Sequence, residues 1–516
     1  MEITGVTYSV DHYNQFAETG DKNYFEEIID AMILDGISGM NDTFRNAIRG
    51  LSRDKKRMTI LSLLDKDLNL FKRIKALTDK NIGKMDHIKD IILMLREYVK
   101  VGEVEKKKFG EVMTPLELVK EMLATLPEEV WSNPNLKWLD PANGTGPYPI
   151  MVIYKLMIGL AEWEPDAEKR YKHIVENMIY VCELQPKNMF LYMCAVDPFD
   201  TYKLNIYTGS FLEPEFDKHM KDVWGVEKFD VVIGNPPYQD NNKNGGFQPK
   251  NHNLWSKFII ESEKKLNNSG YILFVTPDSW RSPSSKILEL FKNNTLLYVE
   301  FDVAKHFPGV GSTFSYYLLK IGKYEEKCKI YDTLIDMKSL KFIPNGGKIG
   351  LSIHLKTTMS ENDKIKLSCD TTSNHSSSKK SQLSKLQSDT NIFKVHHTNA
   401  QTFYSTTKSK NHDSNKVYFT ISGYYSPKYD NGQISTSEIC PYVVVENESE
   451  GLILLSFLDS KLYKFLVNSA KWSGFLNKDI LRLLPNLETN HNYIDEELYE
   501  IFNLTDEEIK FIESQK

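Results

Sequence analysis

Asp-Val-Val-Ile-Gly-Asn-Pro-Pro-Tyr, at residues 230–238, is an apolar run that ends in a stiff polar turn. The apolar part predicts a buried strand, and the two prolines end it because proline fixes φ and cannot donate to a sheet ladder. The turn presents two hydrogen-bond acceptors side by side, the amide oxygen of Asn235 and the carbonyl oxygen of Pro236, next to the ring of Tyr238. These groups can accept both protons of a planar amino group while the ring stacks on its heterocycle. Taken alone, the four residues also fit a proline-rich surface turn.

A second stretch, Leu-Lys-Trp-Leu-Asp-Pro-Ala-Asn-Gly-Thr-Gly at residues 136–146, predicts a strand followed by a glycine loop and a helix. Glycines let the backbone approach a ligand closely, and a helix N-terminus offers free amide groups. Pro149 stands where a dinucleotide fingerprint has its third glycine, which argues against NAD. The next predicted strand, at residues 178–182, ends at Glu183, and a carboxylate at that strand end suits the hydroxyls of a ribose. An exposed surface glutamate is the alternative.

The alternation of strands and helices continues to residue 322. We expect about seven strands in an α/β sheet whose ligands sit at the carboxyl ends of the strands, with the last two strands adjacent. The expected strands are residues 136–140, 178–182, 204–207, 230–233, 271–277, 296–302 and 313–321.

Composition excludes several classes of protein. A chain of 516 residues predicts two or three domains, and its net charge of −6 means that any nucleic-acid surface must be local. Five cysteines without CxxC spacing predict neither a disulfide framework nor a zinc site, so we expect no metal. The start lacks a signal-peptide pattern, and no apolar run approaches the ~20 residues of a membrane span. We therefore expect a cytoplasmic protein without membrane contact.

The region at residues 354–430 differs in character, with 11 lysines against 6 acidic residues in a chain that is negative overall. Aromatic residues are interleaved with its polar groups, among them Tyr404, Phe419, Tyr424, Tyr425 and Tyr429. A surface that tracks a nucleic-acid backbone and contacts bases needs this mixture, although a flexible low-complexity insert is the alternative. A helix is expected at residues 452–467.

Together these stretches resemble the S-adenosylmethionine-dependent, site-specific DNA adenine-N6 methyltransferases of the restriction-modification type, in the gamma motif order. Residues 235–238 match the Asn-Pro-Pro-Tyr signature of that family. Residues 140–146 resemble its Asp-Pro-Ala-Cys-Gly-Thr-Gly motif, with Asn143 in place of cysteine. The resemblance implies a doubly wound, Rossmann-like class I methyltransferase sheet at residues 109–328. It further implies a helical N-terminal extension at residues 1–108 and an α+β target-recognition domain at residues 329–516.

The resemblance also implies roles for individual residues. The S-adenosylmethionine contacts would be Thr114, Asp140, Pro141, Asn143, Gly144, Gly146, Glu183, Leu184, Ser210 and Phe211. Ser210 departs from the family, which usually has an aspartate there to read the cofactor's amino group. The catalytic residues would be Asn235, Pro236, Pro237 and Tyr238, with Tyr238 and Phe314 stacking on the target base. A core role for Phe314 is equally open.

The implied reaction is methyl transfer to N6 of an adenine flipped out of double-stranded DNA. Cytosine-N4 DNA methylation, RNA or protein-glutamine methylation and a catalytically silent DNA-binding module are the alternatives. A fused restriction enzyme is another, because residues 105–107 fit a Glu-x-Lys nuclease pattern, although a solvated linker explains that charge run better. The target sequence, a cognate restriction endonuclease as partner, the oligomeric state and the role of residues 1–108 are left open.

Overall fold

The computed structural model describes residues 114–197, 202–238, 253–307, 313–322, 327–369, 383–399, 401–472 and 476–515. The predictions for residues 1–108, including the helical extension and the nuclease pattern, lie outside these residues. The described chain divides into two compact units. The first unit holds residues 114–277, 293–307 and 314–322, and the second holds residues 278–292, 313 and 327–515.

The first unit is built on a largely parallel sheet. Its strands are β1 (Trp138–Asp140), β2 (Ile179–Glu183), β3 (Asn205–Thr208), β4 (Phe229–Gly234), β5 (Leu266–Pro277), β6 (Thr295–Glu300) and β7 (Phe314–Lys320). They lie in the order β3-β2-β1-β4-β5-β7-β6. The pairs from β3 to β5 are parallel, whereas β7 runs antiparallel to both β5 and β6. Each predicted strand is therefore present, and the last two are adjacent as expected.

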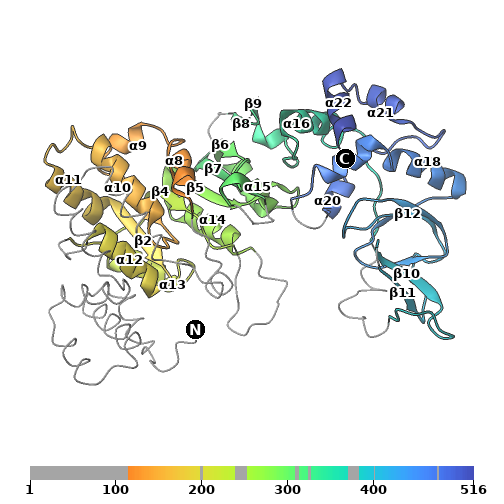
Figure 1. Ribbon diagram of the computed structural model, residues 1–516, viewed down its shortest axis with the longest axis horizontal. Coiled ribbons are helices and arrows are strands. Elements are labelled where there is room, and N and C mark those ends of the chain that lie inside the picture. Colours follow the sequence, from red (N-terminus) through yellow and green to blue (C-terminus); the bar gives the residue numbers. More distant parts are fainter. Residues whose placement is uncertain are drawn as a thin grey trace, which may run out of the picture. The chain divides into compact units, whose positions relative to one another are not determined.

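Helices pack around this sheet (Figure 1). They are α8 (Leu116–Leu123), α9 (Glu129–Ser132), α10 (Pro147–Gly159), α11 (Ala167–His173), a π-helix (Ile174–Met178), α12 (Pro186–Val196), α13 (Pro214–Asp222) and α14 (Leu254–Lys264). Helix α10 contacts β1 and β2, α12 contacts β2 and β3, and α14 contacts β5. Apolar side chains of β1, β2 and β4 and of α8 and α10 form one buried cluster. The predicted α/β fold class is thus confirmed.

The second unit combines short strands with helices. Its strands are β8 (Cys328–Ile330), β9 (Thr333–Ile335), β10 (Phe393–Thr398), β11 (Gln401–Ser405), β12 (Asn415–Tyr418), β13 (Lys428–Asn431), β14 (Ser435–Thr436) and β15 (Tyr442–Val444). Its helices are α15 (Lys286–Asn293), α16 (Gly347–Lys356), α18 (Glu448–Leu458), α19 (Lys461–Asn468), α20 (Lys478–Leu481), α21 (Asp495–Ile501) and α22 (Asp506–Ser514). Two three-stranded sheets, β11-β10-β14 and β13-β12-β15, give it an α+β character. Helix α18 packs on β12 and β13.

Two predictions for the second unit are wrong in detail. The helix expected at residues 452–467 is two helices, α18 and α19, because Ser460 caps a new helix by accepting a hydrogen bond from the Tyr463 amide at 3.2 Å. The aromatic residues expected on a DNA-binding surface do not all lie on the surface. Phe419 and Tyr425 are 0% and 5% exposed and stack on each other with ring centroids 5.7 Å apart, so both belong to the core.

No helix among the described residues is long and apolar enough to cross a membrane.

Candidate functional site

The Asn-Pro-Pro-Tyr turn begins where β4 ends, in contact with the end of β1. Gly234, the last residue of β4, has a φ of +150°, and a Cβ added to it would lie 2.8 Å from Asp140 Oδ1. Glycine is therefore required at this point, because a side chain would collide with the Asp140 carboxyl group. The two stretches singled out in the sequence meet at neighbouring strand ends of one sheet.

Hydrogen bonds hold the side chain of Asn235 in one orientation. Its Nδ2 donates to Thr114 Oγ1 at 3.1 Å, and its Oδ1 accepts from the Tyr238 hydroxyl at 2.6 Å. Thr114 is buried, directly before the proline that precedes α8. Burial raises the pKa of the Tyr238 phenol, so this hydroxyl stays protonated and remains a donor. Thr114, from one predicted motif, therefore forms one hydrogen-bonded chain with Asn235 and Tyr238, from the other.

Two aromatic rings support this chain. Tyr238 lies against Phe314, with ring centroids 5.2 Å apart and the planes inclined by 32°. Phe314 is 3% exposed and also contacts Phe307, which favours the core role for it over direct stacking on a ligand. Tyr238 is only partly buried. Phe314 therefore positions Tyr238, and Tyr238 keeps part of its surface accessible.

Sequence analysis missed Tyr148, in the first turn of α10. Its hydroxyl donates to Met122 Sδ at 3.3 Å, and the side chain is buried. Burial raises the pKa of this phenol well above its ordinary value, although a hydrogen bond with Thr114 opposes the shift. Tyr148 thus extends the chain from Asn235 through Thr114. Nothing in the local sequence pattern marks it, because an aromatic residue in an apolar helix predicts only core.

The loop after β1 brings the predicted cofactor residues together. Asp140 Oδ1 accepts from the Ala142 amide at 3.1 Å, whereas its Oδ2 is buried and has no hydrogen-bond partner in the described part of the chain. Burial raises the pKa of Asp140 well above its ordinary value, and the nearby Glu183 adds to the effect. Pro141 follows within the same loop. A buried carboxyl oxygen without a partner is a favourable neighbour for a cationic or proton-donating ligand.

Glu183 at the end of β2 bridges two loops. Its Oε2 accepts from the Gly144 amide at 2.7 Å and its Oε1 accepts from the Gln185 amide at 2.8 Å. A carboxylate has about four lone-pair sites, so it can still accept from further donors. Leu184, beside it, is 52% exposed, as expected for an apolar side chain that a ligand would cover.

Asn143 and Gly146 shape the loop. The backbone N–H of Asn143 donates to the Cys182 carbonyl at 2.9 Å. The side-chain Oδ1 of Asn143 is buried without a hydrogen-bond partner among the described residues. Gly144 and Gly146 have φ values of +55° and +93°, which glycine adopts readily. A Cβ on Gly146 would also lie 2.5 Å from the Tyr192 ring, so α10 can start here only with glycine.

The residues after β3 are tied into the turn that follows this strand. Ser210 Oγ accepts from the Leu212 amide at 3.3 Å. Phe211 is 1% exposed and packs against Phe216 and Phe258, so its ring lies in the core and supports the turn that follows β3.

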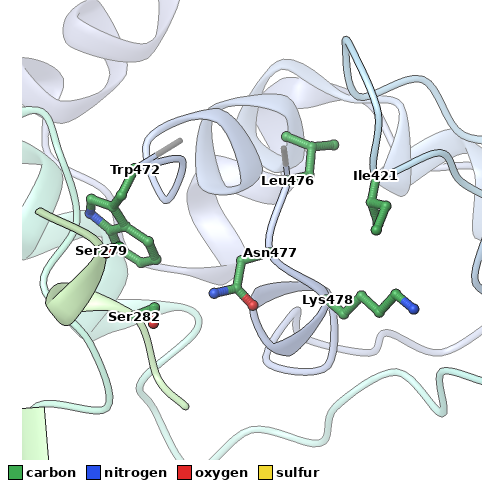
Figure 2. A pocket seen from close by; sticks show the side chains of 7 residues that line it. All are labelled: Ser279, Ser282, Ile421, Trp472, Leu476, Asn477 and Lys478. Carbon is green, nitrogen blue, oxygen red and sulfur yellow. The ribbon is translucent and has the colours of Figure 1, made fainter. Parts of the chain in front are cut away.

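The second unit contains two cavities that no predicted site residue lines. The first, of about 330 Å³, is lined by Ser279, Ser282, Ile421, Trp472, Leu476, Asn477 and Lys478 (Figure 2). Several of its polar groups already serve the fold. The Trp472 indole donates to the Ile343 carbonyl at 3.1 Å, and Lys478 Nζ donates to the Glu438 carbonyl at 2.7 Å. No cluster of three or more metal-binding side chains occurs among the described residues.

Comparisons with known proteins identify relatives of this chain. Residues 168–310 match the Eco57I restriction-modification methylase family. The chain is 27% identical to an uncharacterized adenine-specific methylase of Mycoplasma pneumoniae, in a match that covers 38% of this chain and 64% of the relative. Less than two thirds of the relative's length is therefore represented. The predicted resemblance to restriction-modification methyltransferases is confirmed, and the gamma motif order stays a prediction.

One solved structure supports the fold. A nuclease-deletion mutant of the Type ISP restriction-modification enzyme LlaGI, in complex with a DNA substrate mimic, superimposes with a TM-score of 0.51. That match is 12% identical and covers 98% of this chain and 55% of LlaGI. The ATP-dependent Type ISP enzyme LlaBIII, bound to DNA, gives a TM-score of 0.47 at 11% identity, over 84% of this chain and 41% of LlaBIII.

Proposed function

We propose that this chain, which matches the Eco57I restriction-modification methylase family over residues 168–310, is a site-specific DNA adenine methyltransferase of a restriction-modification system. It transfers a methyl group from S-adenosylmethionine to N6 of an adenine flipped out of double-stranded DNA. The observation that carries the proposal is the contact between the Asn235 turn and the Asp140 loop, at Gly234. A turn that can bind an amino group lies directly beside a loop that can hold the cofactor.

The turn can raise the nucleophilicity of the adenine amino group. An exocyclic adenine amine is a poor nucleophile because its lone pair is delocalised into the ring. Two acceptors on its protons favour a pyramidal nitrogen whose lone pair is free to attack. An amide oxygen such as Asn235 Oδ1 can accept two hydrogen bonds, one of which comes from Tyr238, and the Pro236 carbonyl oxygen is a second acceptor in the same turn. Both acceptors can therefore serve the incoming amino group.

The rate gain comes from positioning. Thr114 and Tyr238 hold the two ends of the Asn235 amide, so its oxygen cannot exchange places with its nitrogen. A preorganised acceptor costs no reorganisation when the reaction occurs. Pro237, after the Pro236 carbonyl, stiffens the turn. The partly accessible Tyr238 ring is the surface on which the flipped base stacks.

The residues of the glycine loop fit S-adenosylmethionine, which supplies the methyl group when bound. Asp140 and Asn143 each have a buried oxygen without a partner in the described chain, suited to the cationic and amino groups of that cofactor. Glu183 would hold the ribose hydroxyls and Leu184 would cover the adenine ring, while Gly144 and Gly146 let the backbone come close. Ser210 would read the cofactor's adenine with the help of backbone groups. Phe211 supports that contact from the core.

The test is transfer of a labelled methyl group from S-adenosylmethionine to plasmid DNA by the full chain, followed by sequencing that reports modified bases. Wild type should modify adenine at a defined sequence. Asn235→Ala should abolish transfer while cofactor binding, measured by calorimetry, stays near wild type. Asn135→Ala, at an exposed position of the same unit, is the matched control and should be fully active. Normal methylation by Asn235→Ala would refute the assignment.

A further inference from the structure

Lys394 and Lys428, on two strands of the second unit, are among the lysines without a negative partner in the described part of the chain. Lys394 on β10 and Lys428 on β13 are exposed, and neither ammonium group forms an ion pair or hydrogen bond with the described residues. Their neighbours behave differently. Lys408 pairs with Asp413 at 2.6 Å, and Lys416 is buried in an ion pair with Asp430 at 2.5 Å. The charges of Lys394 and Lys428 are therefore available to a partner.

His396 lies on β10, two residues from Lys394. Its side chain is 6% exposed, its ring contacts Tyr418 of β12, and its Nε2 has no hydrogen-bond partner among the described residues. Burial, together with the charges of Lys428, Lys394 and His397, lowers the pKa of His396 to about 4. No carboxylate contributes to the shift. The exposed charges of Lys394 and Lys428 therefore favour a bound anion here.

An exposed tyrosine stands beside these charges. Tyr424, in the loop between β12 and β13, is 86% exposed, whereas its neighbour Tyr425 is in the core. Its carbonyl accepts a hydrogen bond from Asn399 Nδ2 at 3.0 Å, which ties the loop to the turn between β10 and β11. The loop is thus braced and its tyrosine ring is left in solvent. With 86% of its area in solvent, the Tyr424 ring is accessible to a partner that reaches this loop.

The strand register adds a second ring to the same surface. Lys394 lies directly opposite Tyr404 in the antiparallel pair β10·β11, so both side chains project from one face of the sheet. Lys428 pairs with Tyr418, whose ring touches His396 from that face. In Figure 1, β10 and β11 lie on the far side of β12 from helix α18. We call the accessible members of this set, Lys394, Tyr404, Tyr424 and Lys428, the basic strand surface.

We propose that the basic strand surface binds double-stranded DNA, with Lys394 and Lys428 on phosphates and Tyr424 against a base edge or sugar. The inference rests on the proposed function and deepens it, because it names the residues that would hold the substrate outside the reacting pocket. Cations without acidic neighbours, an aromatic ring in solvent and a braced loop are the features that backbone-tracking, base-contacting surfaces combine. An acidic protein would match the lysines but would give no reason for an isolated exposed tyrosine.

The phosphate contacts are tested by the salt dependence of binding to linearised plasmid DNA, using the full chain. Each lost phosphate contact lowers the slope of log K against log salt by roughly 0.9, so K394Q/K428Q should lower it by about 2. The matched control is K461Q/K464Q on α19, whose lysines are exposed but already pair with Glu513 and Asp459. The control should keep the wild-type slope. A double variant at Lys394 and Lys428 with an unchanged slope would overturn the phosphate assignment.

The tyrosine contact is tested by Tyr424→Ala against Tyr424→Phe. Loss of the ring should weaken binding about tenfold with little change in the salt slope, because an aromatic contact carries no charge. Tyr424→Phe keeps the ring and should bind within a factor of about two of wild type if stacking dominates. Sequencing of methylated plasmid should show fewer modified sites, or a relaxed pattern, for the alanine variant. Equal affinity and an equal pattern for all three proteins would overturn the role of Tyr424.

The design separates this inference from the proposed function. If wild type methylates DNA and all the variants bind and methylate like it, the basic strand surface is wrong and the enzyme assignment stands. If wild type binds DNA with a slope that depends on Lys394 and Lys428 but transfers no methyl group, the enzyme assignment fails and the surface stands. If wild type does not bind DNA at all, both are wrong.

Discussion

The side-chain nitrogen of Asn235 donates a hydrogen bond to Thr114 Oγ1 across 3.1 Å, although 121 residues separate the two along the chain. This bond and the 2.6 Å bond from Tyr238 fix which end of the amide is oxygen. The acceptor of the proposed reaction is therefore oriented by a residue outside the turn that carries it. That dependence can be tested without touching the turn.

Thr114→Val should slow methyl transfer about tenfold, because it removes an acceptor of the Asn235 side-chain nitrogen and loosens the amide, at a cost of about 1–3 kcal/mol. Thr114→Ser keeps the hydroxyl and should retain most of the activity. The measurement is the turnover rate at saturating DNA and cofactor, together with cofactor affinity. A valine variant as fast as the serine variant would show that the Thr114 bond has no part in positioning Asn235.

Gly234→Ala should both destabilise the first unit and inactivate the protein. The added Cβ would meet Asp140 Oδ1 at 2.8 Å, so either the turn or the loop after β1 must move. Overpacking of this kind costs about 1–3 kcal/mol. Gly225→Ala is the control, because Gly225 also has a positive φ, +67°, but open space around it. Urea denaturation and methyl transfer should show a small loss of stability without loss of activity for Gly225→Ala. Equal effects of the two substitutions would mean that backbone strain, and not the contact with Asp140, explains the glycine.

Lys416→Met should strongly destabilise the second unit. Lys416 and Asp430 are 0% and 2% exposed, and the lysine also donates to the Asn411 carbonyl at 2.7 Å. Removing one member of a buried pair leaves an uncompensated charge, which costs about 3–5 kcal/mol. Lys464→Met, in the exposed pair with Asp459, should cost at most about 1 kcal/mol. Thermal unfolding of both variants is the measurement, and similar melting temperatures would contradict the structural role assigned to Lys416.

Acid should destabilise the second unit through His354. Its Nδ1 and Nε2 lie 2.8 Å from Thr358 Oγ1 and Ser469 Oγ, and burial lowers the pKa of His354 to about 3. In the unfolded chain the pKa of His354 is near the ordinary 6.5, so this side chain binds a proton at a pH at which it stays neutral in the folded chain. Stability is therefore lost as the pH falls from about 6.5 toward 3, by about 2 kcal/mol at pH 5. Denaturant unfolding at pH 7 and pH 5 measures this loss. His354→Gln should show a loss smaller by that amount, and an identical loss would exclude His354 as its source.

The sequence by itself determined the succession of strands along the chain, their membership of one α/β sheet and the two stretches that meet at Asp140 and Asn235. Apolar runs with polar or glycine ends mark buried strands locally, and parallel strands bring their carboxyl ends to one edge. Neighbouring residues alone carry that information. The pattern could not place Tyr148, because a buried phenol in an apolar helix looks like any core residue.

Only the tertiary structure decided how the side chains divide between core and surface. Phe419, Tyr424 and Tyr425 look alike in a polar stretch, yet two of them stack on each other in the core and Tyr424 stands in solvent. The same holds for Lys416, which is buried against Asp430, and Lys394, which has no acidic partner in the described chain. Burial and pairing depend on which distant segments fold over a residue, so they follow from packing and cannot be read from local pattern.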